Sequence, residues 1–581
     1  MLRSRITGGG LALSAGAAAV ALAATTSLAD DWRGVSQSGE QKNMRRVGHA
    51  DLQGRAAYHP YFINYPDRRV MAFVGTHSSA NPSNPPISPD SNLPKPNPLK
   101  PGSPVEANGT MIVDVTDPRR PKEMFHIPGP QANGAAQTQS NRMCLGSDLP
   151  GGVPGRVYMM RNVQTGTAAF SGYEVWDVTD VRNPAFVSAI RNLRNTHKHW
   201  WECKTGIAYL PGSKGPGYPQ EPGQTTPAPQ WRVGQQMVIY DWSNPASPKY
   251  LRTFGLPGAQ PGSSGPTPPT LHGPISTHEH PNAAGKLARS QTPDDVIGNR
   301  IYLAWGVGDN GVLQVLDRKK LLPPSHGGTW DRTVNPATGA TTDDSPTLEE
   351  LLAPQTTRLD MSNDQGGHTS FPVFGLKPKS YHQGPPTQGF TEFLTRDIVV
   401  LASESTADQC QEAPHWSFIV DVTIENSKAR TEGPPALNAQ VNPWQGPMVL
   451  STMWVDPRAG EKYRRGNYCT RGARYGVHSS EENFYNPYYG RLTFIAYFTG
   501  GVRAWDIREP QGPVEVGFYV PASNAFTEPA GYMTNNLEVD DRGYILAVDR
   551  NGAGLDIIEL TGKAKAIGLG KDKGHDDDDD D

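Results

Sequence analysis

Residues 474–520 read RYGVHSSEENFYNPYYGRLTFIAYFTGGVRAWDIREPQGPVEVGFYV, and they set the pattern that the rest of the chain repeats. After His478 come three short runs rich in β-branched and aromatic residues, Leu492–Tyr497, Val502–Asp506 and Val514–Val520, separated by Gly, Pro and Asp. Such runs predict strands rather than helices. Counting the segment around His478, the stretch predicts a four-stranded antiparallel meander, which is the unit of a β-propeller blade.

The third run of this unit recurs along the chain as an apolar strand that ends in Asp and usually precedes a turn containing Pro. Asp at a strand end can accept backbone N–H groups of the turn, and Pro prevents the strand from continuing. A single small sheet cannot bury both of its faces, so repeats of this kind stack. There are seven copies, and the last one has Glu in place of Asp: Asp114, Asp177, Asp241, Asp317, Asp421, Asp506 and Glu559. The chain is therefore predicted to be all-β, a single seven-bladed propeller of four-stranded antiparallel blades.

The N-terminal part of this region is predicted to close the ring. The segment MRRVGHADLQG (44–54) is similar to the last strand of the unit at 513–521, while the seventh repeat ends after Leu560. If the N-terminal segment supplies the outer strand of the last blade, two open sheet edges disappear.

The chain has 581 residues, including 62 Gly and 54 Pro, and a formal net charge of −4. The near-neutral charge argues against a nucleic-acid partner, which would require a basic face. Residues 1–29 have a positive start, an apolar stretch at 11–24 and Ser-Leu-Ala at 27–29, so they are predicted to be a cleaved signal peptide, with an uncleaved membrane anchor as the alternative. The mature protein is expected to be periplasmic or secreted, without a transmembrane segment.

Within the mature chain we expect a flexible segment at 30–43, the propeller at 44–562 and a disordered acidic tail at 563–581. Long insertions are expected at 323–367 and at 431–473. The tail ends in six consecutive Asp residues, which repel one another, although a weak cation-binding role is an alternative.

The four cysteines, at 144, 203, 410 and 469, form an even set in an exported chain. Cys144 and Cys203 lie near the starts of the neighbouring repeats two and three, and Cys410 and Cys469 flank the junction of repeats five and six. We therefore predict the bridges Cys144–Cys203 and Cys410–Cys469. Free buried thiols are the alternative.

Four histidines stand just before the first strand of four consecutive repeats. The first strand of each blade is innermost, so equivalent positions should meet around the central channel. Four imidazoles there could bind a divalent transition metal such as Fe, Cu, Zn or Mn. Taken singly, each could equally be an ordinary turn residue. The predicted metal ligands are His197, His272, His368 and His478.

Two carboxylates near these histidines are candidate catalytic groups, namely Glu404 and Glu481. Either could act as a base on a metal-bound water or orient a ligand imidazole. Each could also be a loop charge without a catalytic role. The neighbouring histidines His199, His278 and His280 could replace ligands of the same repeats.

The strand-end segments VDVTDPRRP, WDVTDVRNP, IYDWSNPASP and WDIREPQGPVEVGFYVP resemble the LVIVD-repeat proteins, which are exported bacterial β-propellers. Further segments are similar to one subgroup of that family: VGHADLQGR (47–55), NTHKHWW (195–201), LHGP (271–274), GHTSFP (367–372), SESTADQCQEAP (403–414) and NYCTRGARYGVHSSEENFYNP (467–487). The resemblance covers most of residues 44–562, includes Cys410 and Cys469, and implies a propeller fold and export. It implies little about activity.

The chain departs from the subgroup in two places. Residues 479–482 are Ser-Ser-Glu-Glu where the subgroup tends to have histidines, and STHEHP follows LHGP. Four histidines in a seven-bladed propeller are also similar in arrangement to those of carotenoid-cleaving oxygenases and of selenium-binding proteins, which is an analogy of architecture alone.

Two functional hypotheses follow. The first is a metal-dependent enzyme, an oxidase or oxygenase rather than a hydrolase, acting on a small-molecule substrate. The alternative is a non-catalytic exported scaffold that binds a cell-surface partner through its loops and an exposed aromatic patch. The segments FYNPYYG (484–490) and PHWSF (414–418) are the candidates for that patch.

Overall fold

The computed structural model describes residues 39–77, 94–130, 137–214, 218, 229–281, 294–380, 395–423, 425, 447–527 and 531–572. The predicted signal peptide (1–29) and the run of Asp residues at the C-terminus lie outside these ranges.

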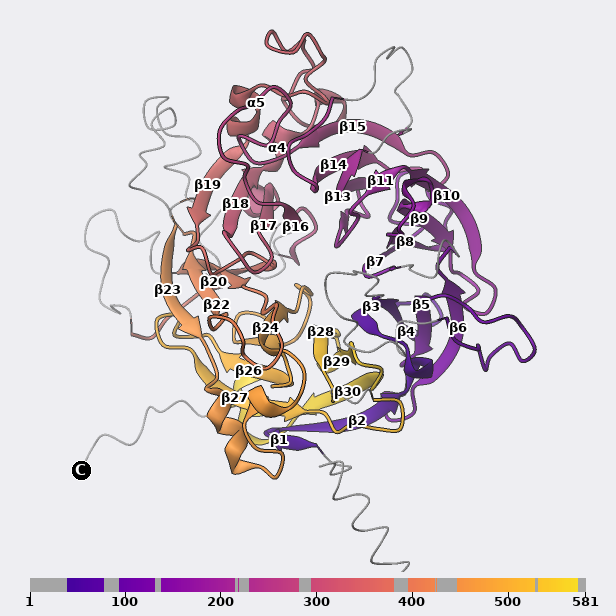
Figure 1. Cartoon of the computed structure of the whole chain (residues 1–581), viewed down its shortest axis with the longest axis vertical. Coiled ribbons are helices and arrows are strands. Elements are labelled where there is room, and N and C mark those ends of the chain that lie inside the picture. Colours follow the sequence, from indigo (N-terminus) through magenta and orange to yellow (C-terminus); the bar gives the residue numbers. More distant parts are fainter. Residues whose placement is uncertain are drawn as a thin grey trace, which may run out of the picture.

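The strands of the described residues form seven antiparallel blades arranged in a ring, which confirms the predicted fold (Figure 1). From the innermost strand outward, blade 1 contains β3 (Ala57–Asn64), β4 (Val70–Thr76), β5 (Gly109–Asp114) and β6 (Lys122–Pro128). Blade 2 contains β7 (Asn141–Leu145), β8 (Val157–Val163), β9 (Gly172–Asp177) and β10 (Ala185–Arg191). Blade 3 contains β11 (Leu193–Arg194), β12 (Trp200–Trp201), β13 (Ile207–Lys214), β14 (Gln236–Asp241) and β15 (Lys249–Phe254).

The other four blades follow the same plan. Blade 4 contains β16 (Leu271–Ser276), β17 (Arg300–Trp305), β18 (Val312–Asp317) and β19 (Gln355–Asp360). Blade 5 contains β20 (Thr369–Leu376), β21 (Arg396–Ala402), β22 (Ser417–Asp421) and β23 (Met448–Met453). Blade 6 contains β24 (Tyr475–Ser480), β25 (Leu492–Phe498), β26 (Val502–Asp506) and β27 (Val514–Val520), and blade 7 contains β28 (Thr534–Val539), β29 (Tyr544–Asp549), β30 (Leu555–Leu560) and β2 (Met44–Ala50).

The helices of the described residues are short and lie between strands or at the end of the chain. They are α3 (Asp294–Ile297), α4 (Arg318–Leu321), α5 (Leu348–Leu352) and α8 (Gly562–Gly568), with 3-10 turns η1 (Leu52–Gly54), η2 (Ala168–Phe170), η4 (Pro324–His326), η6 (Pro457–Lys462) and η7 (Tyr468–Thr470). Helix α5 begins with a capping box, because Thr347 accepts the N–H of Glu350 and Glu350 accepts the N–H of Thr347. None of these helices is long and apolar enough to cross a bilayer.

The repeated Asp marks the end of the third strand in six blades, as predicted. In five of them its carboxylate accepts the N–H of the residue two positions ahead, at 2.9–3.1 Å: Asp114 from Thr116, Asp177 from Thr179, Asp241 from Ser243, Asp421 from Thr423 and Asp506 from Arg508. Asp317 instead accepts from Lys320 at 3.2 Å and caps α4. The motif therefore terminates strands by satisfying backbone donors of the turn.

Strand β2 closes the ring by pairing with β30, with Met44 opposite Leu560 and Ala50 opposite Leu555. This confirms the predicted closure. The segment expected to be flexible at 30–43 is partly ordered, because β1 (Glu40–Lys42) pairs with β27 at the outer edge of blade 6. An open strand edge offers unpaired N–H and C=O groups, and β1 satisfies those of β27.

The outer strands of blades 4 and 5 lie where the sequence analysis placed insertions. Strand β19 falls inside the predicted insertion 323–367, and β23 falls inside 431–473. The strand-end Asp marks only the third strand, so a long connection before the fourth strand conceals it. Likewise, residues 563–581 were expected to be a disordered tail, but residues 563–572 are ordered, with Ala564 and Ile567 of α8 buried.

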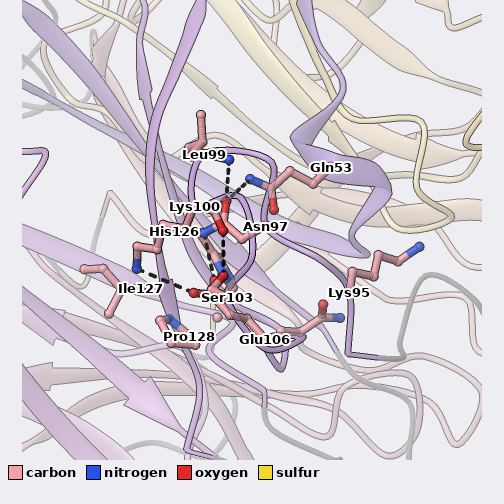
Figure 2. A network of polar contacts seen from close by, with 12 residues as sticks. Gln53, Lys95, Asn97, Leu99, Lys100, Ser103, Glu106, His126, Ile127 and Pro128 are labelled. Carbon is pink, nitrogen blue, oxygen red and sulfur yellow. Dashed lines mark hydrogen bonds and ion pairs between the residues drawn. The ribbon is translucent and has the colours of Figure 1, made fainter.

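A polar network holds the described part of the connection between β4 and β5 against the rest of blade 1 (Figure 2). Asn97 accepts a hydrogen bond from Gln53 at 3.1 Å and donates to Glu106 at 2.9 Å. The Nδ1 of His126 donates to the same carboxylate at 2.6 Å, so the proton of this imidazole lies on Nδ1. The connection is thereby tied both to the N-terminal turn and to β6.

The two predicted disulfides are present, Cys144–Cys203 and Cys410–Cys469, each with a Cα–Cα distance of 5.4 Å. The first joins β7 of blade 2 to the segment after β12 of blade 3. The second joins the loop after β21 to η7, which precedes β24. Disulfides of this kind persist in oxidising compartments.

Candidate metal centre

The four predicted histidines lie in or before the innermost strands of blades 3 to 6, and their rings form a row. His272 and His478 belong to β16 and β24, whereas His368 directly precedes β20 and His197 precedes β12. Successive ring centroids are 4.3, 3.6 and 4.2 Å apart in the order His197, His272, His368, His478. The order along the row is the order of the blades around the axis. Their role as ligands stays a prediction.

Glu404 lies against this row, at the start of the loop that follows β21. One carboxylate oxygen is 3.5 Å from Nε2 of His368, and the other is 3.6 Å from Nε2 of His478. The ligand atoms of His272, His368 and Glu404 all lie within 4.8 Å of one another. Arg474 forms an ion pair with Glu404 at 3.1 Å and so fixes the position of the carboxylate.

Several nitrogens of this cluster are buried without any hydrogen-bond partner. They are Nδ1 of His272, both ring nitrogens of His368 and Nε2 of His478, on side chains that are 0–2% exposed. Buried polar atoms in native proteins are almost always satisfied, and an unsatisfied group costs about 1–3 kcal/mol. A cluster of such atoms that face one another is therefore a candidate ligand shell.

The hydrogen bonds of two histidines determine which nitrogen carries the proton. Nδ1 of His478 lies 2.5 Å from the carbonyl oxygen of Asn535, so Nδ1 is the donor and Nε2 keeps a free lone pair facing Glu404. In His197 the opposite holds, because Nδ1 accepts the N–H of Lys198 at 2.8 Å and the proton lies on Nε2. His478 thus offers a lone pair on Nε2, whereas His197 presents a donor.

All of these imidazoles are neutral at neutral pH. Burial lowers the pKa values of His272, His368 and His478 well below the usual range, and it lowers the pKa of His197 to about 3. Burial also raises the pKa of Glu404, while Arg474 opposes that shift. Neutral imidazoles retain the lone pair that a metal requires.

Glu481, the other predicted catalytic carboxylate, points elsewhere. It accepts the backbone N–H of Phe494 at 2.6 Å and the hydroxyl of Thr493 at 3.4 Å. Burial raises its pKa to about 8. No contact between Glu481 and the four histidines appears among the described residues, and its catalytic role stays a prediction.

The alternative histidine ligands also lie outside the row. Nε2 of His280 is 2.9 Å from the hydroxyl of Tyr489, and Nδ1 of His278 is 3.2 Å from the carbonyl oxygen of Gly298. His199 packs its ring against Tyr173. These contacts place all three among the side chains that pack within and between blades.

A second buried cluster, which the sequence analysis missed, contains His59, Glu482 and Glu538, whose ligand atoms also lie within 4.8 Å of one another. Here the carboxylate of Glu482 already has two cationic partners, because both Lys198 and Arg142 form ion pairs with it. The cluster is therefore an internal ion-pair network. Its Lys and Glu lie within NTHKHWW and the segment after His478, but nothing in the sequence shows that they meet.

Blades 1 and 7 complete the surroundings of the histidine row. The ring of Tyr58, in β3, makes edge contacts with both His197 and His478, with centroids 5.6 Å away in each case. On its other side Tyr58 stacks on His77. Arg550, which follows β29, donates to Nε2 of His77 at 2.9 Å. The sequence pattern singled out only histidines at the starts of repeats, so it did not identify Tyr58, His77 or Arg550 as neighbours of the row.

No protein-family model matches the chain, and no curated protein is similar to it in sequence. Among solved structures, RRP9 WD40 repeats match over 90% of this chain and 99% of that chain, with 9% identity and a TM-score of 0.40. The Dos1 propeller matches over 90% and 96%, with 10% identity and a TM-score of 0.39. Sqt1 from Chaetomium thermophilum matches over 89% and 99%, with 11% identity and a TM-score of 0.38.

These matches carry no statement about function. The architecture of this chain follows from its own strand pairing. Membership of the LVIVD-repeat family remains a hypothesis that rests on the sequence segments quoted above.

Proposed function

We propose that His272, His368, His478 and Glu404 bind one divalent transition metal, and that the protein is an exported metal-dependent enzyme, an oxidase or oxygenase rather than a hydrolase. The observation that carries the proposal is the clustering of buried ligand atoms of His272, His368 and Glu404, together with imidazole nitrogens of His272, His368 and His478 that have no hydrogen-bond partner. Fe, Cu, Zn and Mn all accept imidazole and carboxylate ligands.

The spacing between these atoms suits ligands that share an ion. Atoms that each lie about 2.1 Å from a metal are about 3.0–3.4 Å apart in octahedral or tetrahedral arrangements. The separations of Glu404 from His368 and His478 are 3.5 and 3.6 Å, so they are too long for direct hydrogen bonds and close to the metal-bridged value. The hydrogen bond from His478 Nδ1 to a backbone carbonyl is of the kind that orients metal-bound imidazoles.

The residues around these ligands define their roles. Arg474 holds the carboxylate of Glu404, and the Nε2–H of His197 points away from its own backbone bond as a donor for a bound molecule. When bound, such a metal would act as a Lewis acid or exchange electrons with a substrate. His197 is assigned here to donate a proton or a hydrogen bond, in place of the ligand role predicted from its position in the repeat.

Export to the periplasm or medium belongs to the same proposal. It is supported by the predicted signal peptide, by the resemblance to the LVIVD-repeat family and by two disulfides, which suit an oxidising compartment.

The alternative of a non-catalytic scaffold receives less support. In the segment 484–490, Phe484, Tyr488 and Tyr489 are buried, and Phe484 stacks on Phe371 of blade 5 with centroids 5.2 Å apart. Only Tyr485 is exposed there. Most of this aromatic segment packs between blades and does not form a docking patch.

The test is metal content by inductively coupled plasma mass spectrometry on untagged protein purified from the periplasm or medium. We expect about one metal per chain, lost in His368→Ala and in Glu404→Gln. His326→Ala is the matched control, because His326 pairs with Asp241 outside the row and its loss should leave metal content unchanged. A folded wild-type protein that is metal-free and takes up none when offered would refute the proposal and favour the scaffold.

A further inference from the structure

The side chains beside the histidine row include several hydrogen-bond donors that have no acceptor. Nε2 of His77 accepts from Arg550, so the proton of His77 is on Nδ1, and this buried donor is unpaired. Nε of Arg474 is also buried and unpaired, on a side chain that is 6% exposed. The Nε2–H of His197, fixed by the tautomer, is a third donor.

Arg550 adds a positive charge to these donors. Its only side-chain hydrogen bond among the described residues is the one to neutral His77, and it forms no ion pair with them. Burial and the neighbouring Arg474 lower its pKa to about 10, while Glu404, Tyr58 and Asp408 oppose the shift, so all four groups lie near it. The guanidinium nevertheless remains charged at neutral pH.

With a divalent metal bound, the charge balance of this region would favour an anion. Arg474 and Arg550 are opposed by Glu404 and Asp408, and Asp408 forms no ion pair with either arginine. In the ion-pair network of the second cluster, Lys198 and Arg142 face Glu482 and Glu538. The side chains thus sum to about zero, and a divalent metal would leave an excess of about two positive charges.

The side chains near the row differ in exposure. Arg550, His77 and His197 are each partly exposed, whereas His272, His368 and His478 are buried. Arg550, His77 and His197 are therefore more accessible as side chains than the predicted metal ligands.

We propose that Arg550, together with His77 and Arg474, binds a carboxylate group of the substrate beside the histidine row. A carboxylate offers two acceptor oxygens that match the fork of a guanidinium, and the neighbouring N–H groups add further donors. This inference deepens the proposed function, because it assigns the substrate to the class of small carboxylic acids. It depends on the arginine and donors of the chain itself and is measurable with or without metal.

The experiment is calorimetric titration of the mature protein with benzoate and with its uncharged counterpart benzamide, before and after treatment with a chelator. We expect benzoate to bind and benzamide not to bind. Arg550→Gln should weaken benzoate binding at least about tenfold, and Arg550→Lys should retain part of it. Arg458→Gln is the control, because Arg458 is an exposed arginine paired with Asp456, and its loss should change nothing.

Metal content and thermal denaturation of each variant separate the two proposals. A metal-free wild type whose benzoate binding still depends on Arg550 would refute the metal site and retain the anion site. A metal-bound protein with equal benzoate affinity in wild type and a folded Arg550→Gln would overturn the anion site. Equal binding of benzamide, or no binding of benzoate at millimolar concentration, would overturn it as well.

Discussion

Glu404 and Glu481 lie in similar strand-end contexts but acquire different chemistry from their neighbours. Arg474 and two imidazoles surround the carboxylate of Glu404, whereas Glu481 is enclosed by its own blade and accepts the N–H of Phe494. Both pKa values are raised by burial, but only Glu404 has a cation that opposes the shift. Position relative to a charge therefore separates a candidate ligand from a structural carboxyl group.

Glu481→Gln should stabilise the protein at alkaline pH. Between pH 4.5 and about 8 the unfolded chain carries an ionised Glu481 while the folded protein keeps it protonated, so the free energy of unfolding falls as pH rises. Gln keeps the acceptor for Phe494 without this ionisation, and each pKa unit is worth about 1.4 kcal/mol. Chemical denaturation at pH 5 and pH 9 should show a gain of a few kcal/mol at pH 9 and little at pH 5. Equal stability of variant and wild type at pH 9 would contradict the assignment.

The residue identities at the channel were predictable, but their protonation was not. Histidines at the starts of four consecutive repeats predict that four rings lie together, and they do. Whether Nδ1 or Nε2 carries the proton depends on the Asn535 carbonyl and the Lys198 N–H, which are brought into place by the backbone of other strands or turns. No sequence pattern encodes those contacts, and for this reason His197 was predicted as a ligand.

At the scale of elements, the two disulfides form a natural pair for comparison because each spans 59 residues of sequence. Loss of either should therefore release similar chain entropy and cost roughly 2–4 kcal/mol of stability. Only Cys410–Cys469 joins the loop that carries Glu404 to the segment that leads to Arg474 and His478.

We expect Cys410→Ser/Cys469→Ser to lose metal more readily than Cys144→Ser/Cys203→Ser at equal stability. The measurement is metal retention during dialysis against a weak chelator, together with thermal melting of both double variants. Equal metal retention in the two double variants would show that the Cys410–Cys469 bridge does not position Glu404. Full retention in both would show that neither bridge contributes to the site.

The elements show where sequence patterns succeed and where they fail. The strand-end Asp, with its hydrogen bond to the turn, located the third strand of every blade except the last, where Glu559 instead pairs with Arg45. The outer strands β19 and β23 carry no such marker and follow long connections, so they were assigned to insertions. The position of such an outer strand depends on the neighbouring strand with which it pairs. The sequence of the outer strand alone therefore does not identify it.

At the scale of the whole molecule, many buried histidines make stability depend on pH. Burial lowers the pKa of His126 to about 4 and that of His280 to about 3, whereas both titrate near 6.5 in an unfolded chain. Below pH 6.5 these histidines bind protons in the unfolded chain but stay neutral in the folded protein. The free energy of unfolding therefore falls on acidification.

Urea denaturation should therefore show a loss of several kcal/mol between pH 7 and pH 4.5, with each unit of pKa shift worth about 1.4 kcal/mol. Repeating the series with a chelator separates histidine protonation from metal release. His126→Gln should reduce the slope between pH 6 and pH 4.5, provided that the variant folds. Stability that stays constant from pH 7 to pH 5 would contradict neutral burial of these rings.

The ring is completed by β2 and β30, which come from opposite ends of the chain (Figure 1). Strand β2 is synthesised among the first residues of the domain, whereas its partner β30 is synthesised last. During synthesis the early strand must remain unpaired while the six intervening blades are assembled. Contacts of such large sequence separation are slow to form, so closure is expected to be the late step of folding. If synthesis stopped before residue 555, the chain would lack β30. The unpaired backbone groups of β2 and of the incomplete seventh blade would then be exposed to other molecules.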